Sequence, residues 1–372
     1  MSEFKLREVF NQETVNYISN QIQKNYPEFN KKEFEYETLK NFDTLNFKER
    51  NDRIRDYLIK YLPDEYIKLA IILEKSLGPE IIIDDLKGYE GFYILPMSTI
   101  VSKLGLKKEH LDISVSLLVE MTKRFSSEGP IRPFIRKYPD EMFNYFYNWR
   151  ENTNPHLRRL VSEGTRPRLP LSSPIKQFIE DMDQLNKLID LIEPMMNDPI
   201  LMVRRSVANN FNDISKDNPK MVINTFKKYK DTNNPQIQWT IRHGLRTLLK
   251  QGNVDALELL GFKSALITKP NLKIYTKQFH IGENLEFSLS FKSTKQQLLM
   301  IDYIIYFVKK NTTLKPKTFK WINRVISKNE EVEIKTLQSF KQMSTRKHYS
   351  GEHKLQIMMN GKVIAEEMFQ VL

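Results

Sequence analysis

The helical fold is decided by residues 203–214, VRRSVANNFNDI, and by residues 237–248, IQWTIRHGLRTL, which repeat the same apolar spacing 34 residues later. In each stretch the first, fifth, ninth and twelfth positions are apolar, as one buried face of a helix requires. A helix-pair repeat of this length is typical of HEAT-like α-solenoids, in which each pair buries its apolar face against its neighbours. The sequence therefore predicts an array of such repeats.

Proline marks the starts of the predicted helices. Up to about residue 261, apolar residues recur at helical spacing and glycine is sparse. Asn-Pro or Asp-Pro pairs stand at four of the breaks, and such a pair favours the start of a new helix. These pairs are Asn154-Pro155, Asp198-Pro199, Asn218-Pro219 and Asn234-Pro235. We therefore predict an all-α solenoid of HEAT-like helical repeats over residues 1–262.

The apolar period becomes two after Pro270. Leu285, Phe287 and Leu289 alternate with polar residues, as a half-buried β-strand requires. The Asn360-Gly361 pair is a strong signal for a type I′ hairpin turn. Further β-type runs cover residues 298–308, 317–326, 332–337, 354–359 and 363–372. Six or seven strands of this kind predict an all-β immunoglobulin-like sandwich over residues 263–372.

Composition excludes several classes of protein. The 372 residues include no cysteine, which rules out a disulfide framework, a thiolate zinc site and a thiol nucleophile, and favours a reducing cytoplasm. The first ten residues, MSEFKLREVF, lack the apolar core of a secretory signal. No stretch approaches the roughly 18 uncharged apolar residues of a membrane span. We expect a cytoplasmic protein that is not integral to a membrane.

Positive charge is concentrated at the C-terminal end. Of the net charge of +12, the residues from Leu266 onward carry +9, from 18 basic and 9 acidic side chains. A basic module on a nearly neutral body predicts attraction to a polyanion, such as nucleic acid or an acidic membrane surface. A lysine-rich, solvated surface without a partner is the alternative interpretation.

Polar side chains recur on the helix face opposite the apolar one. At 100° per residue, that face holds the positions two and six residues after the first apolar residue of each helix. Trp239 in such a stripe favours stacking on a ligand, because an exposed indole gains little from water. The full set, after the apolar residues Leu157, Val203 and Ile237, is Arg159, Glu163, Arg205, Asn209, Trp239 and His243, extended by Asp213 and Arg246.

Three carboxylates, Glu128, Glu163 and Asp213, stand among or near basic residues. Taken singly, each fits a helix end or a salt bridge. As a set on an arginine-rich face, they are suited to stabilise a positive charge that develops on a substrate whose phosphates the arginines hold. The sequence has six His but no HExxH motif, and it has no Walker A, GxGxxG or GxSxG sequence. We therefore predict no metal site and no nucleotide cofactor.

Two long motifs carry a family resemblance. Residues 158–170, RRLVSEGTRPRLP, and residues 203–217, VRRSVANNFNDISKD, resemble the AlkC family of bacterial DNA alkylation repair glycosylases. The similarity extends over the whole chain, because residues 300–303, MIDY, and 344–353, STRKHYSGEH, look like the immunoglobulin-like extension found on many members.

The resemblance implies a monofunctional glycosylase that hydrolyses the N-glycosidic bond of cationic alkylated bases such as 3-methyladenine and 3-methylcytosine. It also implies a solenoid that holds double-stranded DNA in its concave surface, without the deep pocket of enzymes that flip a base fully out. We expect a bacterial cytoplasmic monomer that acts in base excision repair without a cofactor and without a membrane.

The resemblance also assigns roles to residues. It implies that Glu128, Glu163 and Asp213 are catalytic, although the nearby Asp217 is easily confused with Asp213 by motif alone. It implies that basic, amide and aromatic side chains hold the phosphates and sugars that flank the lesion. The DNA-binding set is Arg158, Arg159, Arg166, Arg204, Arg205, Asn209, Trp239, His243 and Arg246, with Arg346, Lys347, His348 and Tyr349 in the C-terminal domain.

One position departs from the family pattern and keeps alternatives open. Leu171 follows Leu169-Pro170 where the family usually has Trp, which would weaken stacking or CH–π contact near the lesion. A non-catalytic HEAT-repeat protein that binds damaged or branched DNA is therefore one alternative. A protein-interaction scaffold, the commonest use of α-solenoids, is another.

Overall fold

The computed structural model describes residues 5–80, 91–343 and 346–372. The chain divides into two compact units, Met1–Asp217 with Asn234–Thr240, and Asn218–Asn233 with Ile241–Leu372. The boundary that the sequence predicts between residues 262 and 263 lies between the last helix, which ends at Leu259, and the first strand, which begins at Ile267. We keep that boundary as a proposal.

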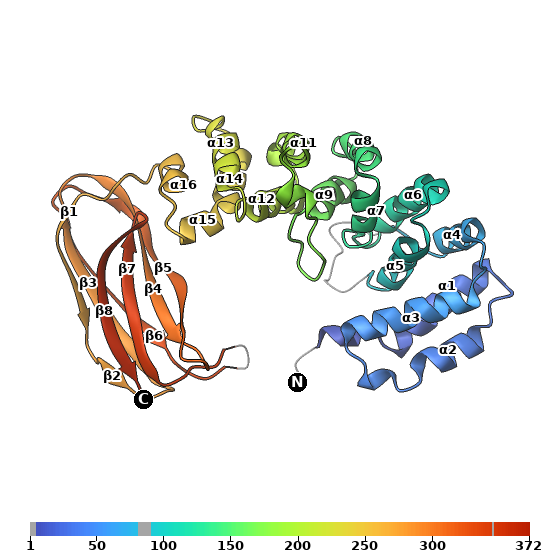
Figure 1. Ribbon diagram of the computed structural model, residues 1–372, viewed down its shortest axis with the longest axis horizontal. Coiled ribbons are helices and arrows are strands. Elements are labelled where there is room, and N and C mark those ends of the chain that lie inside the picture. Colours follow the sequence, from blue (N-terminus) through green and yellow to red (C-terminus); the bar gives the residue numbers. More distant parts are fainter. Residues whose placement is uncertain (1–4, 81–90, 344–345) are drawn as a thin grey trace. The chain divides into compact units, whose positions relative to one another are not determined.

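The first unit is helical, and its successive helices lie side by side in chain order (Figure 1). Short 3-10 helices at Leu6–Val9, Phe42–Thr44, Lys108–His110 and Pro194–Asn197 join or precede the longer ones. The α-helices are α1 Gln12–Asn25, α2 Lys31–Leu39, α3 Phe47–Tyr61, α4 Tyr66–Lys75, α5 Ile94–Leu104, α6 Leu111–Thr122, α7 Arg132–Lys137, α8 Pro139–Trp149, α9 Pro155–Gly164, α10 Gln177–Glu180, α11 Met182–Ile192, α12 Leu201–Ile214 and the first part of α14 Pro235–Gly244.

The proline signal is confirmed for α9, and the helical spacing of apolar residues is confirmed for α9 and α12. Pro155 is the first residue of α9, where a missing N–H costs nothing, and Asn154 Oδ1 caps the helix by accepting from His156 N at 2.9 Å. On α12, the predicted apolar positions from Val203 to Ile214 are buried. The two helices pack against each other, so these apolar faces form the core between repeats.

Two expectations about the helix faces are wrong. The apolar set that starts at Ile237 does not share one helix, because α14 ends at Gly244 and α15 begins at Arg246. The helix face opposite the apolar residues is also not exposed to solvent at every position. Glu163 is 6% exposed and Asp213 is 1% exposed, because polar side chains of neighbouring segments cover them.

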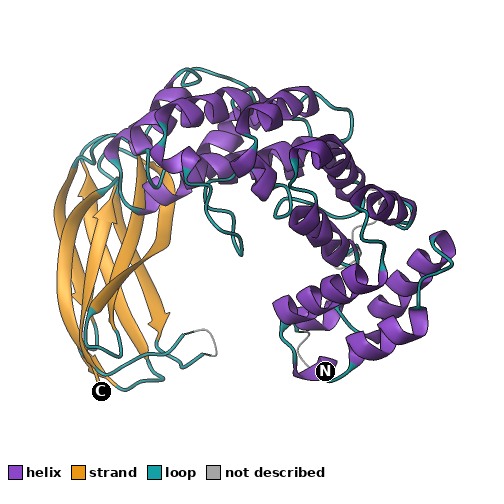
Figure 2. Ribbon diagram, turned by 45° about the vertical axis from the view of Figure 1, so that its right-hand side comes forward, coloured by secondary structure: helices purple, strands orange, loops and turns teal. Residues whose placement is uncertain are grey.

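The second unit joins helices to a β-sandwich, whose two sheets are orange in Figure 2. Its helical parts are α13 Pro219–Lys227, the last part of α14, α15 Arg246–Lys250 and α16 Val254–Leu259. Its strands are β1 Ile267–Ile274, β2 Gln278–Phe279, β3 Asn284–Ser293, β4 Gln297–Val308, β5 Leu314–Ile326, β6 Glu331–Ser339, β7 Gly351–Met359 and β8 Lys362–Val371.

The strands form two sheets with one shared core. One sheet has the order β1-β3-β6 and the other β2-β8-β7-β4-β5; only the β2–β8 pair is parallel among the described pairings. Leu285, Phe287 and Leu289 of β3 pack against Ile301, Tyr303 and Ile305 of β4 in the core. The predicted architecture, helical repeats followed by an immunoglobulin-like sandwich, is confirmed.

The predicted hairpin at Asn360-Gly361 joins β7 to β8. Both residues have positive φ, 43° and 82°, as a type I′ turn requires. Asn360 also donates from Nδ2 to Lys263 O at 2.6 Å and to Leu298 O at 3.1 Å. The turn therefore anchors the segment that enters the sandwich.

Asp302 is a buried carboxylate on β4 without a full set of partners. It is 2% exposed, lies opposite Lys320 of β5, and its Oδ1 atom has no hydrogen-bond partner among the described residues. Burial raises the pKa of Asp302 to about 6, and the nearby Lys320 and Lys250 lower it only in part. The ionised form is therefore disfavoured in the folded protein.

We predict that Asp302→Asn stabilises the protein at neutral pH. Folding raises the pKa of Asp302, so the folded state favours the protonated carboxyl group. The resulting stabilisation is fully present below the unfolded-state pKa of about 4 and is lost as the pH rises through about 6. Asparagine does not ionise, so the Asp302→Asn variant does not lose this stabilisation. Its free energy of unfolding should exceed that of the unmutated protein by on the order of 2 kcal/mol at pH 8, and this difference should vanish near pH 4. Urea unfolding across this pH range measures the difference. Asp231→Asn, at an exposed carboxylate, is the control.

Candidate active site

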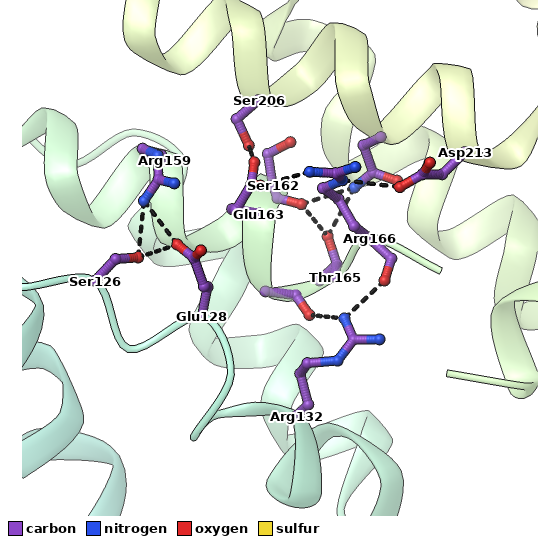
Figure 3. Close-up of polar contacts among 12 residues, drawn as sticks. Ser126, Glu128, Arg132, Arg159, Ser162, Glu163, Thr165, Arg166, Ser206 and Asp213 are labelled. Atoms are coloured by element: carbon purple, nitrogen blue, oxygen red, sulfur yellow. Dashed lines mark hydrogen bonds and ion pairs between the residues drawn. The ribbon is translucent and has the colours of Figure 1, made fainter. Parts of the chain in front are cut away.

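Two of the three candidate carboxylates converge on one arginine. Arg166, in the segment after α9, donates from Nη1 to Glu163 Oε1 at 2.6 Å and from Nε to Asp213 Oδ2 at 2.8 Å (Figure 3). All three residues are buried. Arg166 therefore links the end of α9 to α12 through ion pairs that are shielded from solvent, where charges interact most strongly.

The other oxygens of these carboxylates are also satisfied. Ser206 Oγ, on α12, donates to Glu163 Oε2 at 2.6 Å. Lys216 Nζ, just after α12, donates to Asp213 Oδ1 at 2.7 Å. Every carboxylate oxygen of Glu163 and Asp213 accepts a hydrogen bond, so the orientation of both groups is fixed.

Glu128 lies beside this pair and is more accessible. Arg159 Nη1 donates to Glu128 Oε2 at 2.8 Å and to Ser126 Oγ at 2.7 Å, and Ser126 Oγ donates to the same carboxylate oxygen. The Glu128 side chain is 29% exposed and that of Arg159 is 23% exposed. Because Arg159 lies one helical turn before Glu163 on α9, the Glu128 ion pair adjoins the buried network (Figure 3).

The site is a row of alternating charges. Three carboxylates are matched by three cations, and the exposed fraction of the carboxylate side chains falls from 29% for Glu128 to 8% for Glu163 and 1% for Asp213. Both ends of the row are accessible, because Lys216, which pairs with Asp213, is 39% exposed. In order, the charged residues are Glu128, Arg159, Glu163, Arg166, Asp213 and Lys216.

The end of α9 is held in place by α12. Asn210 Nδ2 donates to Ser162 O at 2.8 Å and to Thr165 Oγ1 at 3.1 Å. Thr165 Oγ1 in turn donates to Val161 O at 2.7 Å. These bonds satisfy carbonyl groups that a helix end leaves without partners, and they fix Glu163 against α12.

Arg166 keeps its charge in this setting. Burial alone lowers the pKa of the Arg166 guanidinium, but attraction to Glu163 and Asp213 and hydrogen bonds to both carboxylates outweigh burial, so the pKa is raised. Glu163 and Asp213 thus share a permanent counter-charge. Across the parts of the chain that the structure describes, no three metal-ligating side chains gather as a metal ion would need.

Several arginines predicted to contact DNA are engaged within the protein. Arg158 donates from Nε to Asp198 Oδ2 at 2.6 Å, and Arg204 Nη1 donates to Asp198 O at 2.6 Å. The Arg204 guanidinium also lies 5.9 Å from the centre of the Trp239 ring. These contacts hold the residues that lie just before α12 and in its first turn. Of the other predicted residues, Arg205 is exposed, whereas Asn209, Trp239, His243 and Arg246 are half-buried.

Residues of the C-terminal domain that the sequence predicts to contact DNA line part of a basic pocket. Arg346, Lys347 and Tyr349 line it together with Asn311 and four lysines; Ser344 and Thr345 lie outside the described residues. The lysines are Lys309, Lys310, Lys315 and Lys317. Six cations that line one pocket make it suited to bind phosphate groups.

His348 does not share this surface. It is 4% exposed, and its ring centre lies 4.9 Å from that of Phe340 in the core. Burial, with a smaller effect of Arg346, lowers the pKa of His348, so the ring is neutral at pH 7. The sequence predicts that His348 contacts DNA, but its side chain is not accessible in this structure.

Comparisons with known proteins place this geometry in a family. A family model described as "Uncharacterised protein YhaZ, C-terminal Ig-like domain" matches residues 268–372. The uncharacterized protein YhaZ of Bacillus subtilis (strain 168) is 35% identical over 368 residues, which cover 98% of this chain and 99% of that protein. The solved structure of Pseudomonas fluorescens alkylpurine DNA glycosylase AlkC, bound to DNA containing an abasic site analog, matches 99% of this chain and 100% of its own, with 30% identity and a TM-score of 0.85. The chain belongs to the AlkC family.

Membership of the AlkC family confirms the resemblance carried by the two motifs. Sequence reasoning nevertheless missed the partners of the carboxylates. Ser206 lies inside the second motif and Ser126 lies two residues before Glu128, but a serine in a sequence gives no sign of the side chain it will contact. Lys216, three residues after Asp213, was detectable as an i,i+3 ion pair at the end of a helix. Within the described residues, no helix of this AlkC family member is both long and apolar enough to cross a membrane.

We predict that Arg166 is essential for stability and that Arg168 is not. Arg166→Met leaves two buried carboxylates without their shared counter-charge, which should lower the free energy of unfolding by about 3–5 kcal/mol. Arg168 makes a bidentate pair with Asp217 at 2.8 and 2.7 Å, but its side chain is 41% exposed. Arg168→Met is the matched control and should cost less than about 1 kcal/mol. If urea unfolding shows that both variants lose the same free energy of unfolding, the buried ion pairs stabilise the protein no more than the exposed pair does.

Proposed function

We propose that this AlkC family member is a monofunctional DNA glycosylase that removes cationic alkylated bases, such as 3-methyladenine and 3-methylcytosine, from double-stranded DNA. The observation that carries the proposal is the cluster of Glu128, Glu163 and Asp213 around Arg159 and Arg166. It occurs in a chain similar over its full length to an alkylpurine DNA glycosylase solved with abasic-site DNA. The activity requires no metal and no nucleotide cofactor.

The chemistry suits fixed carboxylates. An alkylated base already carries a positive charge, so it leaves with the electron pair of the glycosidic bond and becomes neutral. The positive charge passes to the deoxyribose, which resembles an oxocarbenium ion, and water then adds to its C1′ atom and releases a proton. Carboxylates oriented before the reaction stabilise this charge without reorganising, and one of them accepts the proton from water. A deep base-binding pocket is unnecessary for such a labile bond.

The gradient of exposure divides these tasks. Glu128 has the most accessible carboxylate of the three, so it is the group that meets the sugar and the water. Glu163 and Asp213 act from buried positions through their electric field. When a DNA phosphate takes Arg159 from Glu128, the negative field of Glu128 at the sugar increases, which couples DNA binding to catalysis.

We expect Glu163→Gln to bind DNA and to lose excision by about 10²- to 10³-fold, the usual effect of removing one electrostatic stabiliser. Glutamine keeps the shape of the site, because its amide oxygen can accept from Arg166 and its NH₂ group can donate to Ser206. Single-turnover release of the base from a methylated duplex measures the rate, and fluorescence anisotropy measures the affinity. The control is Glu151→Gln, at a side chain that is 73% exposed. If excision by Glu163→Gln matches the unmutated rate, Glu163 has no part in the mechanism.

A non-catalytic protein that binds damaged or branched DNA is the second candidate. Two observations favour it: Arg166 already neutralises Glu163 and Asp213, and Leu171, where the family usually has Trp, is 96% exposed at a positive φ of 61°. Such a protein would bind methylated and unmethylated duplexes and release no base from either. The single-turnover assay distinguishes the two candidates directly.

We also propose that the basic pocket of the sandwich holds DNA phosphates. Replacement of Lys309, Lys310 and Lys315 by Ala should lower the slope of log affinity against log salt concentration by about 0.9 for each phosphate that the protein no longer neutralises. The matched control replaces Lys277, Lys292 and Lys335, which pair with acidic residues elsewhere in the same domain. Both triple variants lose the same charge. Equal slopes would show that net charge matters and the pocket does not.

A further inference from the structure

Arg132, the first residue of α7, is the largest of the fully buried side chains. It is 1% exposed, and in the described part of the chain its guanidinium donates to backbone carbonyls alone, while its Nε has no partner there. Nη1 donates to Gly164 O at 3.0 Å and to Arg166 O at 2.7 Å, and Nη2 donates to Ser173 O at 2.8 Å (Figure 3 shows the two Nη1 bonds). One side chain therefore contacts both ends of the segment that follows α9.

Burial of this cation costs free energy, which its hydrogen bonds to carbonyls offset directly. Among the described residues, no carboxylate lies within ion-pair distance of Arg132. Burial, with repulsion from Arg136 and Arg166, lowers the pKa of Arg132 to about 10, and the attraction of Asp213 and Glu163 offsets this only in part. An apolar side chain of similar volume would remove the donors of three backbone carbonyls, so this position requires a group that donates several hydrogen bonds.

The contacted carbonyls bracket residues 164–173, which carry Arg166. The segment is closed further by Ile175 N, which donates to Pro167 O at 3.1 Å, and by Ser172 N, which donates to Leu169 O at 3.2 Å. Arg136, one turn along α7, donates from Nη2 to Ser173 O at 2.8 Å. At the start of the segment, a Cβ atom on Gly164 would lie 2.8 Å from Ile131 Cγ2, so glycine permits the close approach of α7.

From this geometry we propose that Arg132 is a positioning residue, which clamps residues 164–173 so that Arg166 reaches Glu163 and Asp213 together. This role deepens the proposed glycosylase function and rests on it. The carbonyl of Arg166 is bonded to Arg132 and its guanidinium to the two carboxylates, so the clamp acts on the residue that orients the site. Arg132 itself does not contact the substrate.

The test compares Arg132→Lys with Arg136→Met. Lysine keeps the charge but cannot hold three carbonyls with the planar fork of arginine. Arg136→Met removes only the outer bond to Ser173. Each variant is assayed for melting temperature, DNA affinity, single-turnover base release and the rate of trypsin cleavage at Arg168-Leu169. Proline after Arg166 blocks cleavage there, so Arg168 reports opening of the segment.

For Arg132→Lys we expect cleavage at Arg168 to rise about tenfold relative to cleavage elsewhere, and base release to fall about 10- to 100-fold with DNA affinity changed less than about threefold. Unchanged cleavage and base release in a folded Arg132→Lys would overturn the proposal, as would cleavage that rises equally at all sites. If Arg132→Lys does not fold, Arg136→Met decides: cleavage at Arg168 should rise about two- to threefold at an unchanged melting temperature, and no rise overturns the clamp.

Cleavage by trypsin separates failure of this proposal from failure of the proposed function. If the unmutated protein releases no base, the glycosylase function fails, and with it the role of Arg132 in orienting a catalytic site. The other outcome is that the unmutated protein and Arg132→Lys release base at the same rate, with no extra trypsin cleavage at Arg168 in the variant. In that case the glycosylase function stands and the proposed role of Arg132 is wrong.

Discussion

The buried guanidinium of Arg166, held between Glu163 and Asp213, is the interaction on which the rest of the site depends. Two carboxylates that are 6% and 1% exposed are strongly unfavourable in a protein interior without a counter-charge at hydrogen-bond distance. Arg166 supplies that charge to both at once, and its planar fork sets their orientation. Since Glu163 is on α9 and Asp213 on α12, the same interaction fixes two repeats to each other.

This constraint also explains the division of labour that we propose. A carboxylate neutralised by a buried arginine contributes a field rather than a reactive group, whereas Glu128, paired with the half-exposed Arg159, can exchange partners. Binding of DNA phosphates near Arg159 would therefore change the charge balance at Glu128. Glu163 and Asp213 keep their geometry, because both stay paired with the buried Arg166.

Much of the fold was predictable because its signals are local. Pro155 and Pro235 mark helix starts, Leu285 and its neighbours alternate with period two, and Asn360-Gly361 encodes its turn. Strand β1 was missed because it contains Pro270 and is largely exposed, so it lacks both the alternation and the composition of a central strand. The catalytic candidates followed from motifs, but their burial did not, because it depends on packing between α9 and α12. The role of Arg132 could not be predicted from the sequence, because its partners are backbone carbonyls and every residue type has one.

The most direct test of the account is to incubate the purified protein with methylated genomic DNA and to identify the released bases by chromatography. The account predicts release of 3-methyladenine or 3-methylcytosine, with loss of that release when Glu163 is replaced by Gln. Tight binding of the DNA without any released base would contradict it and would leave a non-catalytic DNA-binding protein.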